Sequence, residues 1–517
     1  MKILLILPAG ENVRVTPERP EVPKRSMLRF SVLSLTVVAA LTPRRHEVRI
    51  VDENVEPLDF AADVDLVGIT FMTALAPRAY EIAARFRARG KIVVGGGFHP
   101  TLCPEEAAQR LDAVVVGDAE GAWERLLQDA EAGRMRKVYT SRACPGSELC
   151  TPVPRRDLLA PTAKHYVTIN AAQTGRGCQH ACRYCSVSAF HGRSYRQRPI
   201  TDVIAELRAL PRDFIFVDDN IVRSPEYARE LFTRMLPLRK RWVGQCSIEI
   251  ADDPGLLRLA HAAGCRGMFI GIETVNQDNL ASVGKQFNDS GRYRQRLRAI
   301  RWRGIGVVAG MMVGLDHDDP GIFESCLRFL RRHGIDALQL NIVTPLPGTP
   351  LFEEMRRTGR IADYRWDRYD FRHVVFQPSR MTAAQLQEGA DWLYSQFYRA
   401  DRILARFVRT VFTCGWVPAL LGLKLNLTYR YDNRRERIAG RNPAARADAL
   451  PALDIRAQPF RDDLGIWQVA ATQNGLGAIP EDHSIPQRSA PGSAHDFCDL
   501  GKTSRFGLFA PQFPKPE

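Results

Sequence analysis

Short runs of apolar and β-branched residues alternate with longer helical patterns through the first two thirds of the chain. Residues 1 to about 130 contain five strand-like runs: 2–7, 47–51, 66–71, 91–94 and 113–116. The segments between them have apolar spacing and Pro or acidic starts that suit helices: 27–41, 77–89, 104–111 and 121–132. Uniformly apolar runs joined by helices are typical of buried parallel strands. We therefore predict an α/β fold whose first domain, residues 1–150, is a doubly wound, Rossmann-like sheet.

The alternation resumes at residue 166 and continues to residue 343. Six strand-like runs are present: 166–170, 214–217, 243–248, 268–272, 307–313 and 338–343. Five helical patterns separate them: 201–210, 225–240, 254–263, 290–302 and 320–333. Six β/α units predict an open (β/α)6 partial TIM barrel within residues 151–378, and in such barrels chemistry lies at the carboxyl ends of the strands.

Composition narrows the class of protein further. A chain of 517 residues should form about two to four domains. With 45% hydrophobic and 25% charged residues it is neither wholly disordered nor collagenous. The net charge of +14 favours anionic partners without choosing among them. No run of 18 apolar residues and no complete signal peptide is present, so we expect a cytoplasmic protein.

Three cysteines crowd into eight residues directly after the first predicted barrel strand. Cys178, Cys182 and Cys185 have the spacing Cys-x3-Cys-x2-Cys. Structural zinc and an all-cysteine [4Fe-4S] cluster each need four protein ligands, whereas this loop offers three, so one iron of a cluster would stay open. Two alternatives are a zinc site completed by His180 or His191 and a chance cluster of inert core thiols.

This loop resembles that of the radical SAM enzymes, whose signature is Cys-x3-Cys-x-aromatic-Cys, with Tyr184 at the aromatic position. The resemblance implies that Cys178, Cys182 and Cys185 each bind one iron of a [4Fe-4S] cluster. It further implies that the open iron chelates S-adenosylmethionine, whose reductive cleavage gives a 5′-deoxyadenosyl radical. An electron donor such as flavodoxin or ferredoxin would supply the electron.

Polar residues follow the other predicted barrel strands. By the same resemblance, Asp218 and Asp219 lie where radical SAM enzymes contact the methionine amino group, and Gln245 or Glu273 meets the ribose. With Tyr184 they form the predicted S-adenosylmethionine site. The alternative is that the carboxylates cap helices or pair with arginines.

Glycines mark the carboxyl ends of the N-terminal strands, where ligands bind in doubly wound sheets. Residues 95–97 are all glycine and Gly117 follows the next strand, so a bulky ligand could approach the backbone closely. The alternative is that these are ordinary tight turns. No GxGxxG follows the first strand, which disfavours a nicotinamide site.

A doubly wound domain placed before a radical SAM barrel is similar to the cobalamin-binding subgroup of that superfamily, over roughly residues 1–375. The turns at 95–101, 116–120 and 344–350 carry this resemblance. It implies a cobalamin site made by five residues: Thr70, Gly96, Gly97, Gly117 and Glu120. The Asp-x-His-x-x-Gly motif of other cobalamin proteins is absent, and the N-terminal domain contains only His46 and His99.

Most members of this subgroup are methyltransferases that act on unactivated carbons, so the resemblance implies a cobalamin-dependent C-methyltransferase. The layout looks like that of the hopanoid C-2 methylases, which suggests a small-molecule or lipid-like substrate. Two alternatives stay open. One is radical cyclisation or rearrangement without methyl transfer, and the other is a nucleic-acid-binding zinc protein. No nucleic acid partner is expected, because the chain lacks an interleaved basic and aromatic module.

The pattern changes after residue 378. Residues 379–450 are predicted to form a helical extension with clustered arginines. Its apolar stretch 411–425, interrupted by Pro418 and Lys424, is too short to span a bilayer. It should lie on a membrane surface or pack across the barrel mouth. Residues 451–517 are predicted to be disordered, because they are rich in proline and lack a sustained period.

Overall fold

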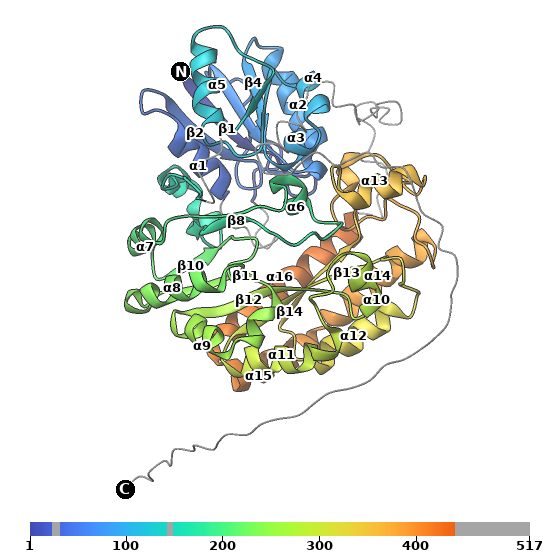
Figure 1. Cartoon of the computed structure of the whole chain (residues 1–517). Helices are drawn as coiled ribbons and strands as arrows, with labels where there is room; N and C mark the ends of the chain where they lie inside the picture. Colours follow the sequence, from blue (N-terminus) through green and yellow to red (C-terminus); the bar gives the residue numbers. More distant parts are fainter. Residues whose placement is uncertain (23–31, 142–147, 440–517) are drawn as a thin grey trace, which may run out of the picture. The chain divides into compact units, whose positions relative to one another are not determined.

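Two six-stranded parallel sheets carry the fold of the computed structural model in Figure 1. The structure describes residues 1–22, 32–141 and 148–439, without the side chains of 432–439. The predicted disordered tail 451–517 therefore lies outside the described residues. So do residues 27–31 of the predicted helix 27–41.

The N-terminal sheet has the strand order β2-β1-β3-β4-β5-β6. Its strands are β1 Lys2–Leu7, β2 Glu47–Asp52, β3 Leu66–Thr70, β4 Ile92–Gly96, β5 Ala113–Val116 and β6 Val138–Thr140. Its helices are α1 Leu33–Leu41, α2 Ala76–Arg87, α3 Phe98–Leu102, α4 Pro104–Arg110 and α5 Ala122–Glu131. The order reverses at β1, so the predicted doubly wound fold is confirmed. The short strand β6 was not predicted.

Alternation along β1 explains why both faces of this sheet are covered. Leu4 and Ile6 pack into one hydrophobic cluster, which contains residues of α2 and α4. Ile3 and Leu5 pack into the other, which contains residues of α1 and α5. Successive side chains of a strand point to opposite faces, so an entirely apolar strand needs helices on both sides.

The second sheet has the strands in chain order, β7-β10-β11-β12-β13-β14, all parallel. They are β7 Ala171–Ala172, β10 Asp213–Phe216, β11 Arg241–Cys246, β12 Cys265–Glu273, β13 Gly306–Val313 and β14 Ala337–Ile342. The helices here are α6 Ser186–His191, α7 Ile200–Ala209, α8 Pro225–Met235, α9 Pro254–Ala262, α10 Gln277–Ser282, α11 Tyr293–Trp302, α12 Ile322–Arg332 and α13 Pro350–Arg357. The predicted partial barrel is confirmed.

Smaller elements complete this region. A separate antiparallel pair, β8 Gly175–Gly177 and β9 Tyr195–Gln197, brackets the cysteine loop. The 3-10 helices are η1 Thr73–Leu75, η2 Arg156–His165, η3 Leu236–Leu238, η4 Ile248–Asp252, η5 Ser290–Arg292 and η6 Trp366–Arg368.

The predicted first barrel strand, 166–170, is wrong. Strand pairing with β10 is confined to Ala171 and Ala172. The Ile215 N–H donates to the Asn170 carbonyl just before this pairing begins. The Tyr166 hydroxyl instead donates to Asp52 at 2.9 Å, and Tyr166 is buried there. The run 166–170 looks like a strand in the sequence, but its Tyr166 makes a long-range contact with the end of β2.

The C-terminal helices are α14 Ala383–Phe397, α15 Ala400–Cys414 and α16 Trp416–Ala439. The predicted apolar stretch 411–425 is not one helix, because Gly415, with φ of +88°, separates α15 from α16. Asn426 donates to the Asp336 carbonyl at 2.7 Å, and Asp336 immediately precedes β14. The expectation that the stretch 411–425 packs across the barrel mouth is therefore wrong, since α15 and the first half of α16 pack at the amino ends of the strands.

Among the residues that the structure describes, none of the helices combines the length and the apolar character needed to cross a bilayer.

Candidate functional site

The cysteine loop begins at a glycine that no other residue can replace without strain. Gly177 ends β8 with φ of +89°. A Cβ placed on it would lie 2.2 Å from the Ser194 carbonyl oxygen across the hairpin. Its N–H donates to Asp219 Oδ2 at 2.9 Å, which ties the loop to the end of β10. The hairpin thus fixes where Cys178 starts.

The three cysteine thiols converge within this loop. Cys182 is buried, and Cys178 and Cys185 are half-buried. Burial raises the pKa of Cys182 to about 11 against the lowering effect of the Lys285 charge, and the other thiols add a smaller increase. Burial also raises the pKa of Cys178 and Cys185. Cysteine thiols bind metal only after losing their protons. A bound iron cluster would therefore have to supply the positive charge that stabilises the three thiolates.

The donor set fits a polynuclear cluster, in which each thiolate binds a different iron. Within the described ranges, no group of three or more His, Cys, Asp or Glu side chains is arranged to hold a single metal ion. His180, considered for a zinc site, stacks on Phe287 with ring centroids 3.9 Å apart. Burial, and then the neighbouring Arg223, lowers the pKa of His180 to about 4.

The segment after α10 supports the loop from outside. The Arg183 N–H donates to the Val283 carbonyl at 3.0 Å, and the Leu351 N–H donates to the Arg183 carbonyl at the same distance. A Cβ on Gly284 would lie 3.0 Å from the Ala181 carbonyl oxygen, so the two backbones are in close contact. The loop therefore depends on two segments, about 100 and about 170 residues further along the chain.

Asp218 carries an unsatisfied carboxylate oxygen inside the site. Its Oδ1 accepts hydrogen bonds from the Thr174 N–H at 2.9 Å, the Thr174 hydroxyl at 2.5 Å and the Gly175 N–H at 2.7 Å. Its Oδ2 is buried and has no hydrogen-bond partner within the described part of the chain. Burial outweighs the three donors and raises the pKa of Asp218 to about 7. A buried carboxylate oxygen in this state fits a cationic ammonium group.

Asp219, Gln245 and Tyr184 lie around the same strand ends. Burial raises the pKa of Asp219 to about 6. Gln245 donates to the Asp219 carbonyl at 2.9 Å. Tyr184 is packed against the hydrophobic core, and burial, followed by the charge of Glu273, raises the pKa of its hydroxyl.

Glu273 forms an ion pair with Lys285, a residue that no sequence pattern had indicated. Both side chains are nearly buried, with 13% and 12% of their area exposed. Glu273 has φ of +65° at an irregularity in the pairing of β12 with β13, which turns its side chain out of the regular alternation. The charge of Glu273 and of Cys182 helps to raise the pKa of Lys285 against the larger, opposing effect of burial.

The predicted cobalamin residues follow adjacent strands of the N-terminal sheet. Thr70 ends β3, Gly96 ends β4 and Gly117 follows β5, so the fold brings them to one edge. Gly97 has φ of +97°, and a Cβ there would lie 2.7 Å from Thr70 Oγ1. The Gly117 N–H donates to Thr101 Oγ1 at 3.0 Å. The glycines let these turns pack tightly at the edge where ligands bind in doubly wound sheets.

The two histidines of this domain are engaged elsewhere. His99 is fully buried, with Nε2 3.2 Å from the Tyr80 hydroxyl and 3.4 Å from Glu106 Oε1. His46 lies at the amino end of the sheet, 3.1 Å from the amino terminus of Met1. The arrangement therefore fits cobalamin binding in which neither histidine is the axial ligand.

Glu120, predicted to contact cobalamin, pairs with Arg176. The guanidinium of Arg176 donates to Glu120 at 3.1 Å and to Asp118 at 2.9 Å, and Arg196 also contacts Asp118. These arginines lie on the two strands that bracket the cysteine loop. Sequence reasoning missed them, although Arg176 directly precedes Gly177 in the loop motif.

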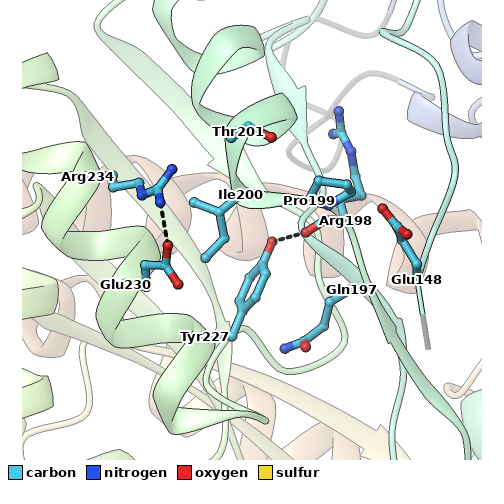
Figure 2. Close-up of a pocket in the computed structure, with 9 residues that line it drawn as sticks. All are labelled: Glu148, Gln197, Arg198, Pro199, Ile200, Thr201, Tyr227, Glu230 and Arg234. Carbon is cyan, nitrogen blue, oxygen red and sulfur yellow. Dashed lines mark hydrogen bonds and ion pairs between the residues drawn. The ribbon is translucent and has the colours of Figure 1, made fainter. Parts of the chain in front are cut away.

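Two cavities border the β8–β9 hairpin and the cysteine loop. One, of about 350 Å³, is drawn in Figure 2 and lies among β9, α7 and α8; Tyr227 in its wall donates to the Arg198 carbonyl at 2.8 Å. A second, of about 400 Å³, is lined by Arg183 of the cysteine loop and by Glu353, Glu354, Arg356 and Arg357 of α13.

Comparison with known proteins places this geometry in a family. The family model of the B12 binding domain matches residues 28–127, and that of the radical SAM superfamily matches residues 173–330. The bacteriochlorophyllide d C-12(1)-methyltransferase of Chlorobaculum tepidum is 33% identical over 385 residues, covering 72% of this chain and 84% of the relative. The chain belongs to the cobalamin-binding radical SAM enzymes.

Two further proteins are similar to this chain in sequence or in fold. The hopanoid C-2 methylase of Rhodopseudomonas palustris is 29% identical and covers 65% of this chain and 67% of the relative. The structure of the radical S-adenosylmethionine methyltransferase TsrM from Kitasatospora setae, with cobalamin and a [4Fe-4S] cluster bound, has a TM-score of 0.61. It covers 85% of this chain and 99% of TsrM at 16% identity, and so supports the fold.

These findings confirm the prediction of a cobalamin-dependent radical SAM methyltransferase. They confirm its three cofactors as well: a [4Fe-4S] cluster, S-adenosylmethionine and cobalamin. They favour this enzyme class over the nucleic-acid-binding zinc protein considered from the sequence. The roles of the individual site residues stay predictions.

Proposed function

We propose that this cobalamin-binding radical SAM enzyme methylates an unactivated carbon of a chlorophyll-type tetrapyrrole. The observation that carries the proposal is the 33% identity to a bacteriochlorophyllide methyltransferase over 84% of that protein. The hopanoid C-2 methylase is matched at lower identity over 67% of its length, which makes a polycyclic lipid the second candidate. The two candidate substrates, a tetrapyrrole and a polycyclic lipid, are both large and mostly apolar ring systems.

We propose the following roles for the residues of this chain. Cys178, Cys182 and Cys185 hold the cluster, and the free oxygen of Asp218 receives the ammonium group of S-adenosylmethionine. When bound, the cluster, S-adenosylmethionine and cobalamin supply one-electron reduction, a carbon-centred radical and a transferable methyl group. The Glu273–Lys285 pair keeps Tyr184 and the cysteine loop in place.

The cobalamin would lie at the edge of the N-terminal sheet formed by Thr70, Gly96, Gly97 and Gly117. Arg176 then acts as the link between this edge and the cysteine loop, through Asp118 and Glu120. We propose the domain boundaries 1–150, 151–378 and 379–450 for the cobalamin domain, the barrel and the helical extension.

The electron donor is proposed to be an acidic flavodoxin or ferredoxin. Arg183 stands between two cluster ligands in the sequence, and with Arg356 and Arg357 it lines the cavity of about 400 Å³. Glu354 pairs with Arg183 and Glu353 pairs with Arg356, so Arg357 is the excess cation at this cavity that would attract an acidic partner.

The test is an anaerobic assay of reconstituted enzyme with bacteriochlorophyllide and, separately, with a hopanoid. The expected product of the first assay gains one methyl group, labelled when the methyl of S-adenosylmethionine is labelled. Cys182→Ala should abolish turnover and lower the iron content, while Cys150→Ser, at an exposed cysteine outside the loop, should retain both.

Two outcomes would contradict the proposal. A product with an unchanged number of carbon atoms would favour cyclisation or rearrangement. Methylation of the hopanoid without methylation of the tetrapyrrole would reverse the order of the two substrate classes.

A further inference from the structure

Helices α15 and α16 present large apolar side chains to solvent. On α15, Leu404, Val408 and Phe412 are four residues apart, so they form one stripe, and 63%, 46% and 85% of their area is exposed. On α16, Trp416, Leu420 and Leu427 continue it with 64%, 54% and 46% exposed. We call these six side chains the hairpin face.

The two stripes lie on neighbouring helices of one hairpin. The helices pack side by side and are joined by Gly415 alone. The ring of Phe407 on α15 contacts that of Trp416 on α16, with centroids 6.2 Å apart. Contiguous exposed apolar patches are rare on soluble monomers, and large ones mark interaction sites.

The opposite side of the hairpin is already occupied by the barrel. Thr410 donates to a carboxylate oxygen of Asp336, and Asn426 donates to the Asp336 carbonyl at 2.7 Å. A Cβ on Gly306, at the start of β13, would lie 3.3 Å from the Pro418 side chain. Packing against the barrel therefore accounts for the inner side of the hairpin, whereas the hairpin face stays exposed within the described part of the chain.

The loops at the same end of the barrel are strongly basic. Six cations lie in or beside the connections that lead into β10, β11, β13 and β14: Arg212, Arg239, Lys240, Arg303, Arg331 and Arg332. The acidic residues of these connections are neutralised, since Asp213 pairs with Arg241 and buried Asp336 pairs with Arg301.

Cations also lie within and beside the apolar stripes. Lys424 is exposed on α16 between Leu420 and Leu427. On α11, which contacts α15, the Arg298 guanidinium lies 4.0 Å from the ring centroid of Trp302, and 68% of Trp302 is exposed. Aromatic and aliphatic side chains ringed by Lys and Arg are the composition of surfaces that insert shallowly into lipid headgroups.

We propose that the hairpin face binds peripherally to an anionic lipid bilayer. The apolar side chains enter the headgroup region, and the surrounding cations attract the anionic lipids. A second copy of the chain fits less well, because a symmetric contact would bring two basic surfaces together. Since the hairpin packs at the amino ends of the barrel strands, the carboxyl ends with the site stay away from the membrane. This inference does not depend on the proposed substrate.

The test is flotation of the full-length protein with phosphatidylcholine vesicles that contain or lack about one third phosphatidylglycerol. We expect binding to the anionic vesicles at low salt, and much weaker binding to the neutral ones or at about 1 M salt, where the Debye length falls to about 3 Å. Phe412→Ser combined with Leu420→Ser should lower the partition coefficient at least roughly tenfold. Val153→Ser, at an exposed apolar residue near α1, is the matched control and should bind normally.

Iron content and circular dichroism of the double variant should match those of the wild type, because both side chains are exposed. Flotation that is equally strong with the double variant, or equal binding to neutral vesicles, would overturn the proposal. So would a chain that stays with the non-floating fraction and sediments as a dimer that the double variant dissociates.

Discussion

Arg176 forms an ion pair with Asp118, 58 residues earlier in the chain, at 2.9 Å. Arg176 belongs to the strand that leads into the cysteine loop, and Asp118 belongs to the turn after β5 at the predicted cobalamin edge. Both side chains are largely buried, with 13% and 10% exposed. The pair therefore couples the position of the iron-sulfur loop to that of the cobalamin edge.

Replacing Arg176 should lower the stability of the folded protein. Arg176→Ala removes the cation from Glu120, which among the described residues keeps only the Thr151 hydroxyl as a donor, while Asp118 keeps Arg196. Breaking a buried ion pair by removing one member costs about 3–5 kcal/mol. We expect the free energy of unfolding in denaturant to fall by about this amount and the corrinoid content to fall with it. Adding Glu120→Gln to Arg176→Ala should recover part of the loss, because it removes the carboxylate whose cation has been taken away. Independent, additive losses in that double-mutant cycle would show that the pair is not coupled.

Gly177→Ala should prevent the cysteine loop from forming correctly. The left-handed backbone and the Ser194 carbonyl 2.2 Å from the added Cβ both oppose a side chain. We expect a clear loss of iron and sulfide after anaerobic reconstitution. Gly90→Ala is the matched control, since Gly90 has φ of +72° but nothing within 4 Å of an added Cβ, so it should cost about 1 kcal/mol and retain the cluster. Full iron content in Gly177→Ala would contradict the expectation.

The affinity for S-adenosylmethionine should rise with pH. Asp218 has a pKa of about 7 when its site is empty, and an ammonium group prefers the ionised carboxylate. About one tenth of Asp218 is ionised at pH 6 and about nine tenths at pH 8, so binding should be roughly tenfold weaker at pH 6. Calorimetry of the reconstituted enzyme measures this. Asp218→Asn should bind weakly at both pH values, and an unchanged pH dependence in that variant would exclude Asp218 as the titrating group.

The same shift predicts how stability depends on pH. The pKa of Asp218 is higher in the folded protein than in the unfolded chain, so the folded state holds a proton that the unfolded state loses above about pH 4. The free energy of unfolding of the ligand-free protein should therefore fall between about pH 4 and pH 7 and level off above that. Across this range the free energy of unfolding of the wild type should fall relative to that of Asp218→Asn, which lacks the titrating carboxyl. Denaturation of both proteins at each pH measures this change.

The C-terminal helices should depend on Asp336. This buried side chain pairs with Arg301, accepts the Val307 N–H at 2.7 Å and accepts the Thr410 hydroxyl. Asp336→Ala should lower the free energy of unfolding by about 3–5 kcal/mol, because Arg301 would be left buried without its partner. Asp401→Ala, which removes an exposed ion pair on α15, should leave the denaturation midpoint unchanged. Equal stability of both variants would mean that Asp336 does not anchor the helices.

Local patterns in the sequence were sufficient for the architecture and for the family. Five N-terminal strands and five of the six barrel strands lie where their apolar runs predicted them, because burial on both faces of a parallel sheet requires such runs. The spacing of Cys178, Cys182 and Cys185 indicated the iron-sulfur loop, since all the ligands lie within eight residues. The prediction was wrong at 166–170, where the same local pattern is compatible with a strand and with a segment that makes a long-range side-chain contact.

Tertiary structure decided the contacts between segments distant in the chain. The pairing of Arg176 with Asp118 and Glu120, and the support of the cysteine loop by residues 283–287, join parts whose proximity no local period encodes. The same holds for the C-terminal hairpin, whose composition indicated amphipathic helices but whose position at the amino ends of the strands depends on buried contacts with Asp336. Periodicity fixes which face of an element is apolar, whereas the choice of partner for that face is made by the packing of the whole chain.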